Sequence, residues 1–446
     1  MSEHTDLTPA PVEQSPSQTP APAHEQPGAL ARELVLANGV TLPNRLAKAA
    51  TSERLASRHG APTRQLIEAY RRLAHSGVGL MISGNVMVDG SAMEAHRNVV
   101  IEDGRFLPEL RRWAAVTEGT GTRFLLQLSH PGRQTMRGTS VAGRRHDVVS
   151  ASEVPLTVGG PMFRAPRALS EPEILDVVRR FGTAARVAAA AGFDGVELHA
   201  AHGYLLSQFL SPLVNHRTDR WGGPLQNRMR LLVEALRAVR STAPEGFVVA
   251  VKLNSADFQR GGFEADDALV VARALQAEGV HLIEVSGGTY EAAAMLDGVP
   301  QRASTAAREA YFLEFAERFR RELDVPIMLS GGFRTRQGMV EAVTGGAVDL
   351  VGLARPISHD PDFPRRVLDG SIEASATPSV ALGLREVDGL LNSAWHQQQL
   401  ARLGRGRAVR PGRHALVALA LFVFTTARDA LVTRLPVLHR PAAGSP

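Results

Sequence analysis

Two histidines and a tyrosine lie close together in the chain, at His199, His202 and Tyr204. Two imidazoles can donate hydrogen bonds to one carbonyl oxygen and stabilise the negative charge that develops on it. A phenol two residues further on can give a proton to a carbanion-like carbon. Zinc binding is the rival interpretation, but no third histidine or carboxylate lies at an obvious partnering position. The cluster therefore predicts polarisation of a carbonyl compound, followed by proton transfer.

A second group of residues is suited to a phosphate. Glycines follow two apolar segments, at Ser286–Gly288 and Gly331–Gly332, and Ala354-Arg355 follows a third. Glycine-rich turns present backbone N–H groups, and a guanidinium binds phosphate through two hydrogen bonds. One such turn is more often only a tight turn, but three in this order are typical of the phosphate site of an α/β barrel.

Lysine is rare, since Lys48 and Lys252 are the only two lysines beside 48 arginines. Both lie in apolar segments that we interpret as strands, where a point charge and a guanidinium differ most in what they bind. Lys252 has two interpretations. It is either an electrostatic partner of a bound ligand, or the nucleophile of a Schiff-base aldolase.

These residues need a scaffold that brings them to one place, and eight apolar segments provide it. Near-continuous apolar runs are typical of parallel strands that are covered on both faces. Helical patterns lie between them, and the first carries Ser170 and Pro172 at its start and Gly192 at its end. The predicted strands are Leu46–Ala50, Leu80–Asn85, Phe124–Leu128, Gly195–His199, Val248–Leu253, Leu282–Ser286, Val325–Ser330 and Asp349–Leu353, and the clearest helices are Glu171–Ala191, Leu225–Ser241, Ala265–Glu278 and Ala307–Leu323.

Eight strands that alternate with helices predict a closed (β/α)8 barrel. A doubly wound open sheet is disfavoured because no Gly-x-Gly-x-x-Gly follows the first strand. The long interval between Leu128 and Gly195 predicts a loop excursion over one end of the barrel. Asn38-Gly39 between short apolar pairs predicts a two-residue hairpin that closes the bottom. In such a barrel the polar groups at the strand ends, which include Asn85 and Gln127, meet at one face.

Composition limits the remaining choices. The chain of 446 residues has no cysteine, which excludes disulfides, Cys-ligated metals and thiol nucleophiles and favours a reducing, cytoplasmic location. No basic stripe interleaved with aromatics indicates nucleic-acid binding. The apolar run Ala415–Phe424 is shorter than the roughly 20 residues that cross a bilayer. We expect a disordered tail over 1–28, a barrel over 29–375 and an Arg-rich helical extension over 376–446, which leaves self-association open.

With these residues in view, the chain resembles the old yellow enzyme family of FMN-dependent NAD(P)H oxidoreductases. The resemblance runs from about Leu36 to Arg355 and includes Glu197–Gln208. It is most specific in the stretch His199–Pro212 together with the downstream Asp219–Gly223 and Asn227-Arg228. The other matching pieces are Pro43-Asn44-Arg45, Gln127–Arg133, Val251–Asn254, Gly331-Gly332 and Ala354-Arg355.

The resemblance implies a position for each residue around non-covalently bound FMN. The backbone of Ala49, Ala50 and Thr51 would lie against the flavin ring near N5. Gln127 would bind the pyrimidine edge, Lys252 would lie near N1 and the C2 carbonyl, and Asn85 would also contact the cofactor. Gly331, Gly332, Ala354 and Arg355 would hold the phosphate. His199 and His202 would bind the substrate oxygen, and Tyr204 would be the proton donor.

The resemblance implies a hydride passed from NADH or NADPH through flavin to an activated alkene, such as an α,β-unsaturated carbonyl compound. The chain departs from the family pattern in three places. Ala49-Ala50-Thr51 replaces more usual Ser/Pro-rich residues, Ser52 stands where some relatives have a redox-tuning cysteine, and Lys252 replaces the usual arginine. These departures concern the flavin potential. A Schiff-base aldolase and a non-catalytic flavin-binding protein stay as alternatives. The sequence leaves the alkene and the choice between NADH and NADPH open.

Overall fold

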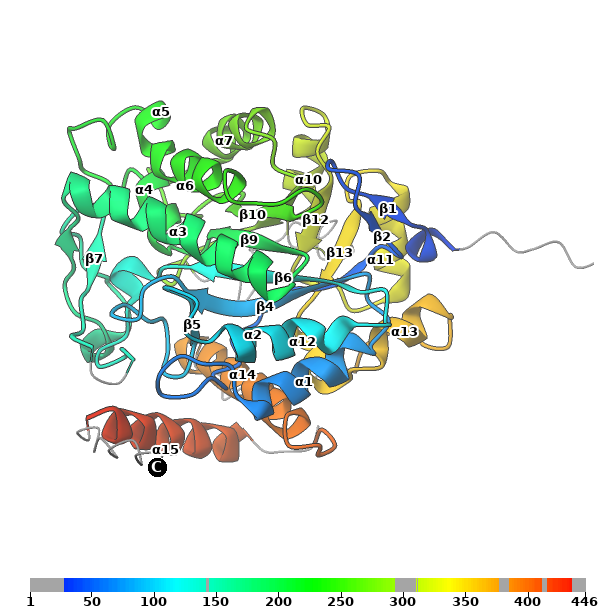
Figure 1. The fold of residues 1–446 in the computed structure, drawn as a ribbon. Coiled ribbons are helices and arrows are strands. Elements are labelled where there is room, and N and C mark those ends of the chain that lie inside the picture. The colour runs from blue at the N-terminus through cyan, green and yellow to red at the C-terminus, as the bar shows by residue number, and fades with distance from the viewer. Residues whose placement is uncertain are drawn as a thin grey trace, which may run out of the picture.

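The computed structural model of the chain describes residues 28–141, 144–292, 310, 312–376, 385–410 and 415–434. The tail expected over residues 1–28 lies outside this description except for Gly28. Figure 1 shows a barrel of strands surrounded by helices, with the last two helices outside it.

The eight predicted strands form one closed parallel barrel. Neighbouring strands follow the order β3-β4-β6-β9-β10-β11-β12-β13, and the pairing of β13 with β3 closes the ring. The observed ends differ from the predicted ends by at most two residues, so the (β/α)8 prediction is confirmed. The barrel strands are β3 (Leu46–Lys48), β4 (Leu80–Met87), β6 (Arg123–Ser129), β9 (Gly195–Ala200), β10 (Val248–Asn254), β11 (Leu282–Ser286), β12 (Ile327–Ser330) and β13 (Leu350–Leu353).

Helices cover the outside of the barrel. The predicted Glu171–Ala191 is observed as α3, which begins at a capping box between Ser170 and Glu173 and ends at Gly192 with φ 92°. The predicted helix Leu225–Ser241 is instead two helices that meet at Met229. The surrounding helices are α1 (Arg64–Ala74), α2 (Leu107–Ala114), α3 (Glu171–Ala191), α4 (Leu205–Leu210), α5 (Leu225–Arg228), α6 (Arg230–Arg240), α7 (Ala265–Ala277), α10 (Leu313–Arg320), α11 (Arg336–Thr344), α12 (Arg355–His359) and α13 (Phe363–Leu368).

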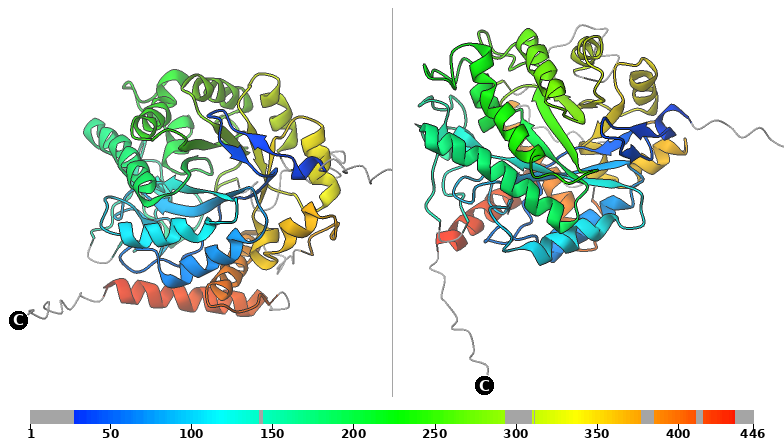
Figure 2. Two further views of the ribbon diagram at one scale, coloured as in Figure 1. Left: turned by 45° about the vertical axis from the view of Figure 1, so that its right-hand side comes forward. Right: turned by 45° about the horizontal axis from the view of Figure 1, so that its top comes forward.

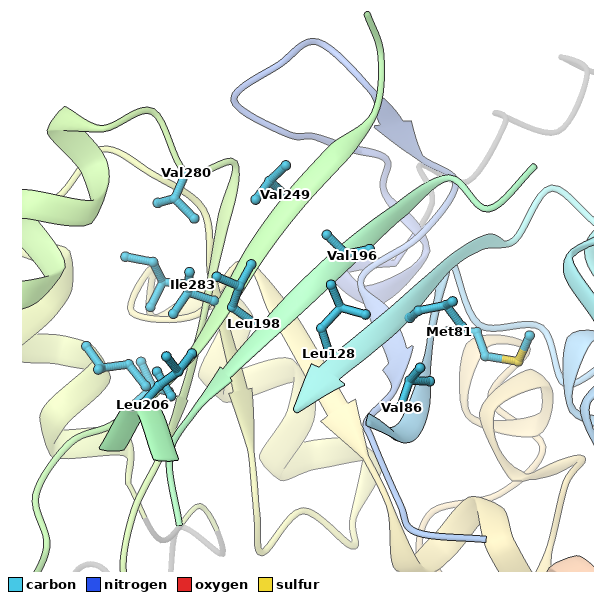
Figure 3. Packing of buried hydrophobic residues seen from close by; sticks show 14 of the residues in the cluster. Met81, Val86, Leu128, Val196, Leu198, Leu206, Val249, Val280 and Ile283 are labelled. Atoms are coloured by element: carbon cyan, nitrogen blue, oxygen red, sulfur yellow. The ribbon is translucent and has the colours of Figure 1, made fainter. Parts of the chain in front are cut away.

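Side chains alternate between the two faces of the barrel wall. Figure 3 shows part of the outer layer, in which Leu128, Val196, Leu198, Val249 and Ile283 are fully buried and face the helices. The alternate positions point inward, as the period of a strand requires. At the bottom of the barrel the inward positions are apolar, and they form one cluster of buried residues that includes Ala47, Leu80, Leu125, Val248, Ala250, Leu282, Met328 and Leu350.

An N-terminal hairpin closes this apolar end. Strands β1 (Leu34–Val35) and β2 (Thr41–Leu42) pair with Leu34 opposite Leu42, and both leucines belong to the inner cluster. The predicted plug is therefore confirmed, but the predicted two-residue turn is wrong. The Leu36 N–H donates to the Val40 carbonyl, which leaves three residues in the loop, and Gly39 is left-handed with φ 81°. A three-residue loop with glycine in this conformation preserves the twist of the strands.

Two segments extend the barrel. Residues between β6 and α3 form the predicted excursion, with the short strands β7 (Val149–Ser150) and β8 (Arg167–Ala168), while β5 (Val99–Val100) pairs with the end of β4. After the barrel come α14 (Arg385–Leu403) and α15 (Ala415–Arg434), which lie side by side along the α1 side of the molecule (Figure 2). Trp395 of α14 is fully buried and lies against His359 of α12, so α14 packs on the helices around the barrel. Within the described residues, no helix has the length and apolarity needed to cross a bilayer.

Candidate functional site

The barrel brings the predicted site residues to one end. They come from seven of its strands, and in a closed parallel barrel the carboxyl ends of all strands meet at one face. Inward-facing residues become polar toward this face. Above the apolar cluster, one layer consists of Gln127, Glu197, Lys252, Glu284 and Ser330, which we call the polar layer. Pairing in register places Gln127 beside Glu197, and Lys252 beside both His199 and Glu284.

The histidines and the tyrosine form one cluster above the polar layer. The His199 ring centroid lies 5.0 Å from that of His202 and 4.6 Å from that of Tyr204. His202 has φ 60°, a left-handed conformation that is uncommon for a residue other than glycine. Its backbone N–H donates to Asn254 Oδ1 at 3.1 Å, and the side chain of Gln134 donates to its carbonyl. Hydrogen bonds on both sides thus hold the turn that places the second imidazole beside the first.

Both imidazoles are neutral. Burial, the other histidine and the ammonium of Lys252 lower the pKa of His199 well below its usual value. Burial and Lys252 do the same to the pKa of His202. The Ala201 N–H donates to His199 Nδ1 at 3.3 Å, which assigns the ring proton to Nε2. His202 Nε2 lies 2.8 Å from Ser286 Oγ. When this hydroxyl donates, the ring proton is on Nδ1, so each ring keeps one N–H for a ligand oxygen.

The Tyr204 hydroxyl is buried beside two further polar groups. Asn85 Nδ2 donates to it at 3.4 Å, and the hydroxyl of Tyr290 lies 3.1 Å away. Burial, Tyr290 and Glu94 raise the pKa of Tyr204 well above its usual value, so the phenol keeps its proton. The sequence prediction did not include Tyr290. The only local signal was its position just after Ser286-Gly287-Gly288, at the end of a predicted strand.

The polar layer contains a buried ion pair. Lys252 Nζ lies 2.7 Å from Glu284 Oε1, with the two side chains 6% and 0% exposed. Ser330 also donates to Glu284, and Gln127 Nε2 donates to Glu197 Oε2 at 2.6 Å. Glu197 and Glu284 are neighbours, and each has one oxygen without a donor among the described residues. A proton shared between the two carboxyl groups would satisfy both oxygens.

The two carboxyl groups carry different charges. Burial and the charge of Glu284 raise the pKa of Glu197 well above its usual value, so this group is protonated. Burial alone would raise the pKa of Glu284, but the ammonium of Lys252 and hydrogen bonds from its neighbours hold that pKa below its usual value. The layer therefore holds one ammonium, one carboxylate and one carboxylic acid. Neither glutamate was among the predicted site residues.

We expect Glu197→Gln to make the protein more stable than the wild type at high pH. In the wild type, Glu197 must take up a proton on folding once the pH exceeds its unfolded value of 4.5. Stability then falls with rising pH, by at most about 1.4 kcal/mol per pH unit, until the folded pKa is reached. Glutamine is already neutral and can still donate to Glu284. Urea unfolding from pH 5 to pH 8 measures the difference.

The control for this prediction is Glu118→Gln, which removes a carboxyl group at an exposed position. This variant is expected to follow the wild type across the same pH range. A difference between Glu197→Gln and the wild type that stays constant from pH 5 to pH 8 would show that Glu197 is ionised in the folded protein.

Lys48 lies outside the barrel mouth. Its ammonium is fully buried and donates to the carbonyls of Ala49 at 3.1 Å and Ile82 at 2.8 Å, and to the Tyr70 hydroxyl at 3.3 Å. Burial lowers its pKa to about 8, although Glu53 opposes this shift. Lys48 thus ties the carboxyl end of β3 to the first half of β4. Ala49, Ala50 and Thr51 directly follow this end of β3.

The predicted phosphate residues lie together at the ends of neighbouring strands. Gly331 and Gly332 directly follow β12, with φ 112° and 95°, and Ala354 and Arg355 directly follow β13. All four are partly exposed, although the strands that precede them are buried. Positive φ values require glycine there, and the missing side chains let a ligand approach the backbone N–H groups.

Polar atoms without partners face the same end of the barrel. Thr51 Oγ1 and Asn85 Oδ1 are buried and have no hydrogen-bond partner among the described residues. Buried polar groups are normally hydrogen-bonded, so orphaned atoms at a strand end indicate a place for a polar ligand. Around such a ligand the mouth offers amide, hydroxyl and imidazole groups, one ion-paired ammonium and a guanidinium.

Similarity to known proteins identifies the family of the chain. Residues 34–373 match the sequence profile of the NADH:flavin oxidoreductase / NADH oxidase family. The NADH-dependent flavin oxidoreductase iccE of Talaromyces variabilis is 36% identical over 409 residues, which cover 84% of this chain and 99% of that protein. The similarly named iliE of a Neonectria species is 37% identical over 410 residues, which are 83% of this chain and only 53% of that protein.

A solved structure shows the same fold. An old yellow enzyme homologue from Zymomonas mobilis matches with a TM-score of 0.66 and 24% identity, over 78% of this chain and 94% of that one. The match to the family profile covers most of the chain, and FMN is the flavin of this family. The chain therefore belongs to the NADH:flavin oxidoreductase / NADH oxidase family, as an oxidoreductase of the old yellow enzyme type.

Proposed function

We propose that this oxidoreductase reduces an activated alkene, such as an α,β-unsaturated carbonyl compound, with NADH or NADPH as the reductant. Bound FMN would supply the hydride chemistry between the nicotinamide and the alkene. The observation that supports the alkene is the cluster of two neutral imidazoles and one protonated phenol at the mouth of the barrel. The imidazoles can polarise a carbonyl oxygen, and the phenol can protonate the carbon next to it.

The residues at the mouth fit FMN. Thr51 Oγ1 and Asn85 Oδ1, the two orphaned atoms, suit the polar edge of an isoalloxazine ring. The backbone of Ala49, Ala50 and Thr51 would line the ring, and Gln127 would bind its pyrimidine edge beside Lys252. The N–H groups of Gly331, Gly332 and Ala354, with the guanidinium of Arg355, would hold the phosphate.

Each residue of the cluster has a separate task. His199 and His202 donate their remaining N–H groups to the substrate oxygen and so favour the enolate-like charge. Tyr204 gives its proton to the α-carbon. Tyr290, 3.1 Å from the Tyr204 hydroxyl, can pass its proton to Tyr204 afterwards and take up another from solvent water, because the other neighbour, the Asn85 amide, has no acidic proton. The four residues together bind the oxygen, protonate the carbon and restore the acid.

The ion pair argues against the aldolase alternative. A Schiff base requires a neutral amine that attacks a carbonyl, whereas the Lys252 ammonium is held by the Glu284 carboxylate. An ammonium in this place instead favours negative charge on a ligand above the polar layer.

The test is to supply the purified protein with FMN and measure NADH and NADPH oxidation with and without 2-cyclohexenone under anaerobic conditions. We expect a yellow protein that consumes one reduced nicotinamide for each saturated ketone formed. A yellow protein that oxidises the reduced nicotinamide equally with and without the enone would contradict an activated alkene as the substrate. A protein that binds FMN and oxidises no nicotinamide would favour the flavin-binding alternative.

A further inference from the structure

Helix α15 presents an apolar face to the outside of the molecule. Among its described side chains, residues 417 and 419–428, none is buried. Val417, Val423 and Phe424 are 42%, 57% and 63% exposed, and Ala420 and Ala427 share the same face. A helix on the surface of a globular protein normally turns its apolar stripe inward. Here the outward stripe is apolar, so it is suited to an apolar surface outside the protein.

The face of α15 that meets the protein body carries the polar contacts. The guanidinium of Arg54 donates to Thr426 Oγ1 at 3.2 Å and lies 5.1 Å from the centre of the Phe422 ring. Helix α14 packs against α15, and Figures 1 and 2 show α15 at the outer edge of the molecule. The helix is thus attached by one side and open on the other.

The segment around α15 has a strong positive charge. Residues 401–446 contain eight arginines and one aspartate, a net charge of +7, while the other 400 residues contain 42 basic and 44 acidic groups. Arg405, Arg407 and Arg410, which precede the helix, are exposed. The basic excess of the chain is therefore concentrated next to its exposed apolar helix.

We propose that α15 and the arginines before it bind the surface of an anionic lipid bilayer. An apolar helical face inserts at the level of the headgroups, and flanking arginines bind anionic lipids. A second copy of the chain is a poorer partner, because a two-fold contact through this segment would place two charges of +7 against each other. Val417, Ala420, Val423, Phe424 and Ala427 also lack the side-chain hydrogen-bonding groups that mark a specific protein interface, and the exposed Arg428 beside them adds positive charge.

Binding there would place the substrate mouth near the lipid. Arg54, which contacts α15, lies three residues after Thr51, in the loop that follows β3. The helix is therefore attached to a loop of the carboxyl face of the barrel. An apolar alkene dissolved in the bilayer would have a short path to this face.

Co-sedimentation with vesicles tests the proposal. We expect the full chain to bind vesicles of phosphatidylglycerol and phosphatidylcholine, to bind pure phosphatidylcholine more weakly, and to dissociate as salt is raised. The double variant Val423→Asp/Phe424→Asp should weaken binding at least about tenfold, because it replaces two apolar side chains that would insert into the bilayer by charged ones. Replacing Arg405, Arg407 and Arg410 by serine should weaken it by about fivefold for each arginine.

Leu175→Asp is the matched control. Leu175 is an exposed apolar residue, 47% accessible, on α3 and away from α15. This variant should bind vesicles like the wild type. No binding of the wild type to anionic vesicles would overturn the proposal, as would equal binding by the Val423→Asp/Phe424→Asp variant. Sedimentation without lipid compares the oligomeric states of the wild type and this variant. A dimeric wild type and a monomeric variant would show that the face serves self-association instead.

Discussion

Tyr204→Phe is expected to slow reduction of the alkene by about 10²–10⁴-fold and to change reduction of the flavin by NADH by less than about twofold. The Tyr204 ring centroid lies 4.6 Å from that of His199, whose imidazole belongs to the pair that would bind the substrate oxygen. Its raised pKa keeps it protonated at neutral pH. Transfer of hydride from nicotinamide to flavin needs no proton from this group, so only one half of the reaction should respond.

Anaerobic rapid mixing measures the two halves separately through the flavin absorbance. Tyr290→Phe is the matched control, because it removes a hydroxyl 3.1 Å from Tyr204 and leaves the Tyr204 proton in place. Its effect on the alkene half should be less than about tenfold. A Tyr204→Phe variant that slows both half-reactions equally would identify Tyr204 as a packing residue. If Tyr290→Phe slows the alkene half-reaction as much as Tyr204→Phe does, Tyr290 would be the acid instead.

The barrel could be predicted from the sequence because its signals are local. A strand that is covered on both faces is apolar at nearly every position, so it can be recognised from its own residues. Helix α3 likewise carries its own start and stop residues. The break at Met229 was missed because its cause is not local. Arg228 reaches back to the carbonyl of Gly223 and across to that of Leu210, and these contacts depend on the folded chain.

The site residues also divide into those with a local sequence signal and those whose role depends on the folded chain. His199, His202 and Tyr204 were visible because one short segment carries all three. Glu197 and Glu284 were missed, although both lie in predicted strands, because a buried carboxyl group becomes notable only when its neighbours are known. Those neighbours come from other strands: Gln127 for Glu197, and Lys252 for Glu284. Tyr290 likewise meets Tyr204 only through the packing of two loops.

The ion pair of the polar layer leads to a second large effect. Lys252→Met should destabilise the protein without FMN by about 3–5 kcal/mol, since removing one partner leaves an unpaired buried charge. The side chain of Glu284 is 0% exposed. The ammonium of Lys252 has the largest of the effects that lower the pKa of Glu284 against burial. Chemical unfolding in urea gives the free energies of the wild type and the variant.

The loss should also depend on pH in a defined direction. In the wild type the pKa of Glu284 is below its unfolded value of 4.5, so its contribution to stability is present above that value and is lost as the pH falls through the folded pKa. Without Lys252, burial raises the folded pKa above the unfolded one, and stability then falls as the pH rises. The difference between Lys252→Met and the wild type should therefore be larger at pH 8 than at pH 5.

The double variant Lys252→Met/Glu284→Gln separates charge from packing. Glutamine removes the buried charge and still accepts the hydrogen bond from Ser330, so most of the lost stability should return. Glu284→Gln alone leaves the ammonium of Lys252 unpaired and should also be destabilised. If the double variant is as unstable as the sum of the two single variants, the two side chains do not interact, and Lys252 would then be available to a ligand as an independent charge.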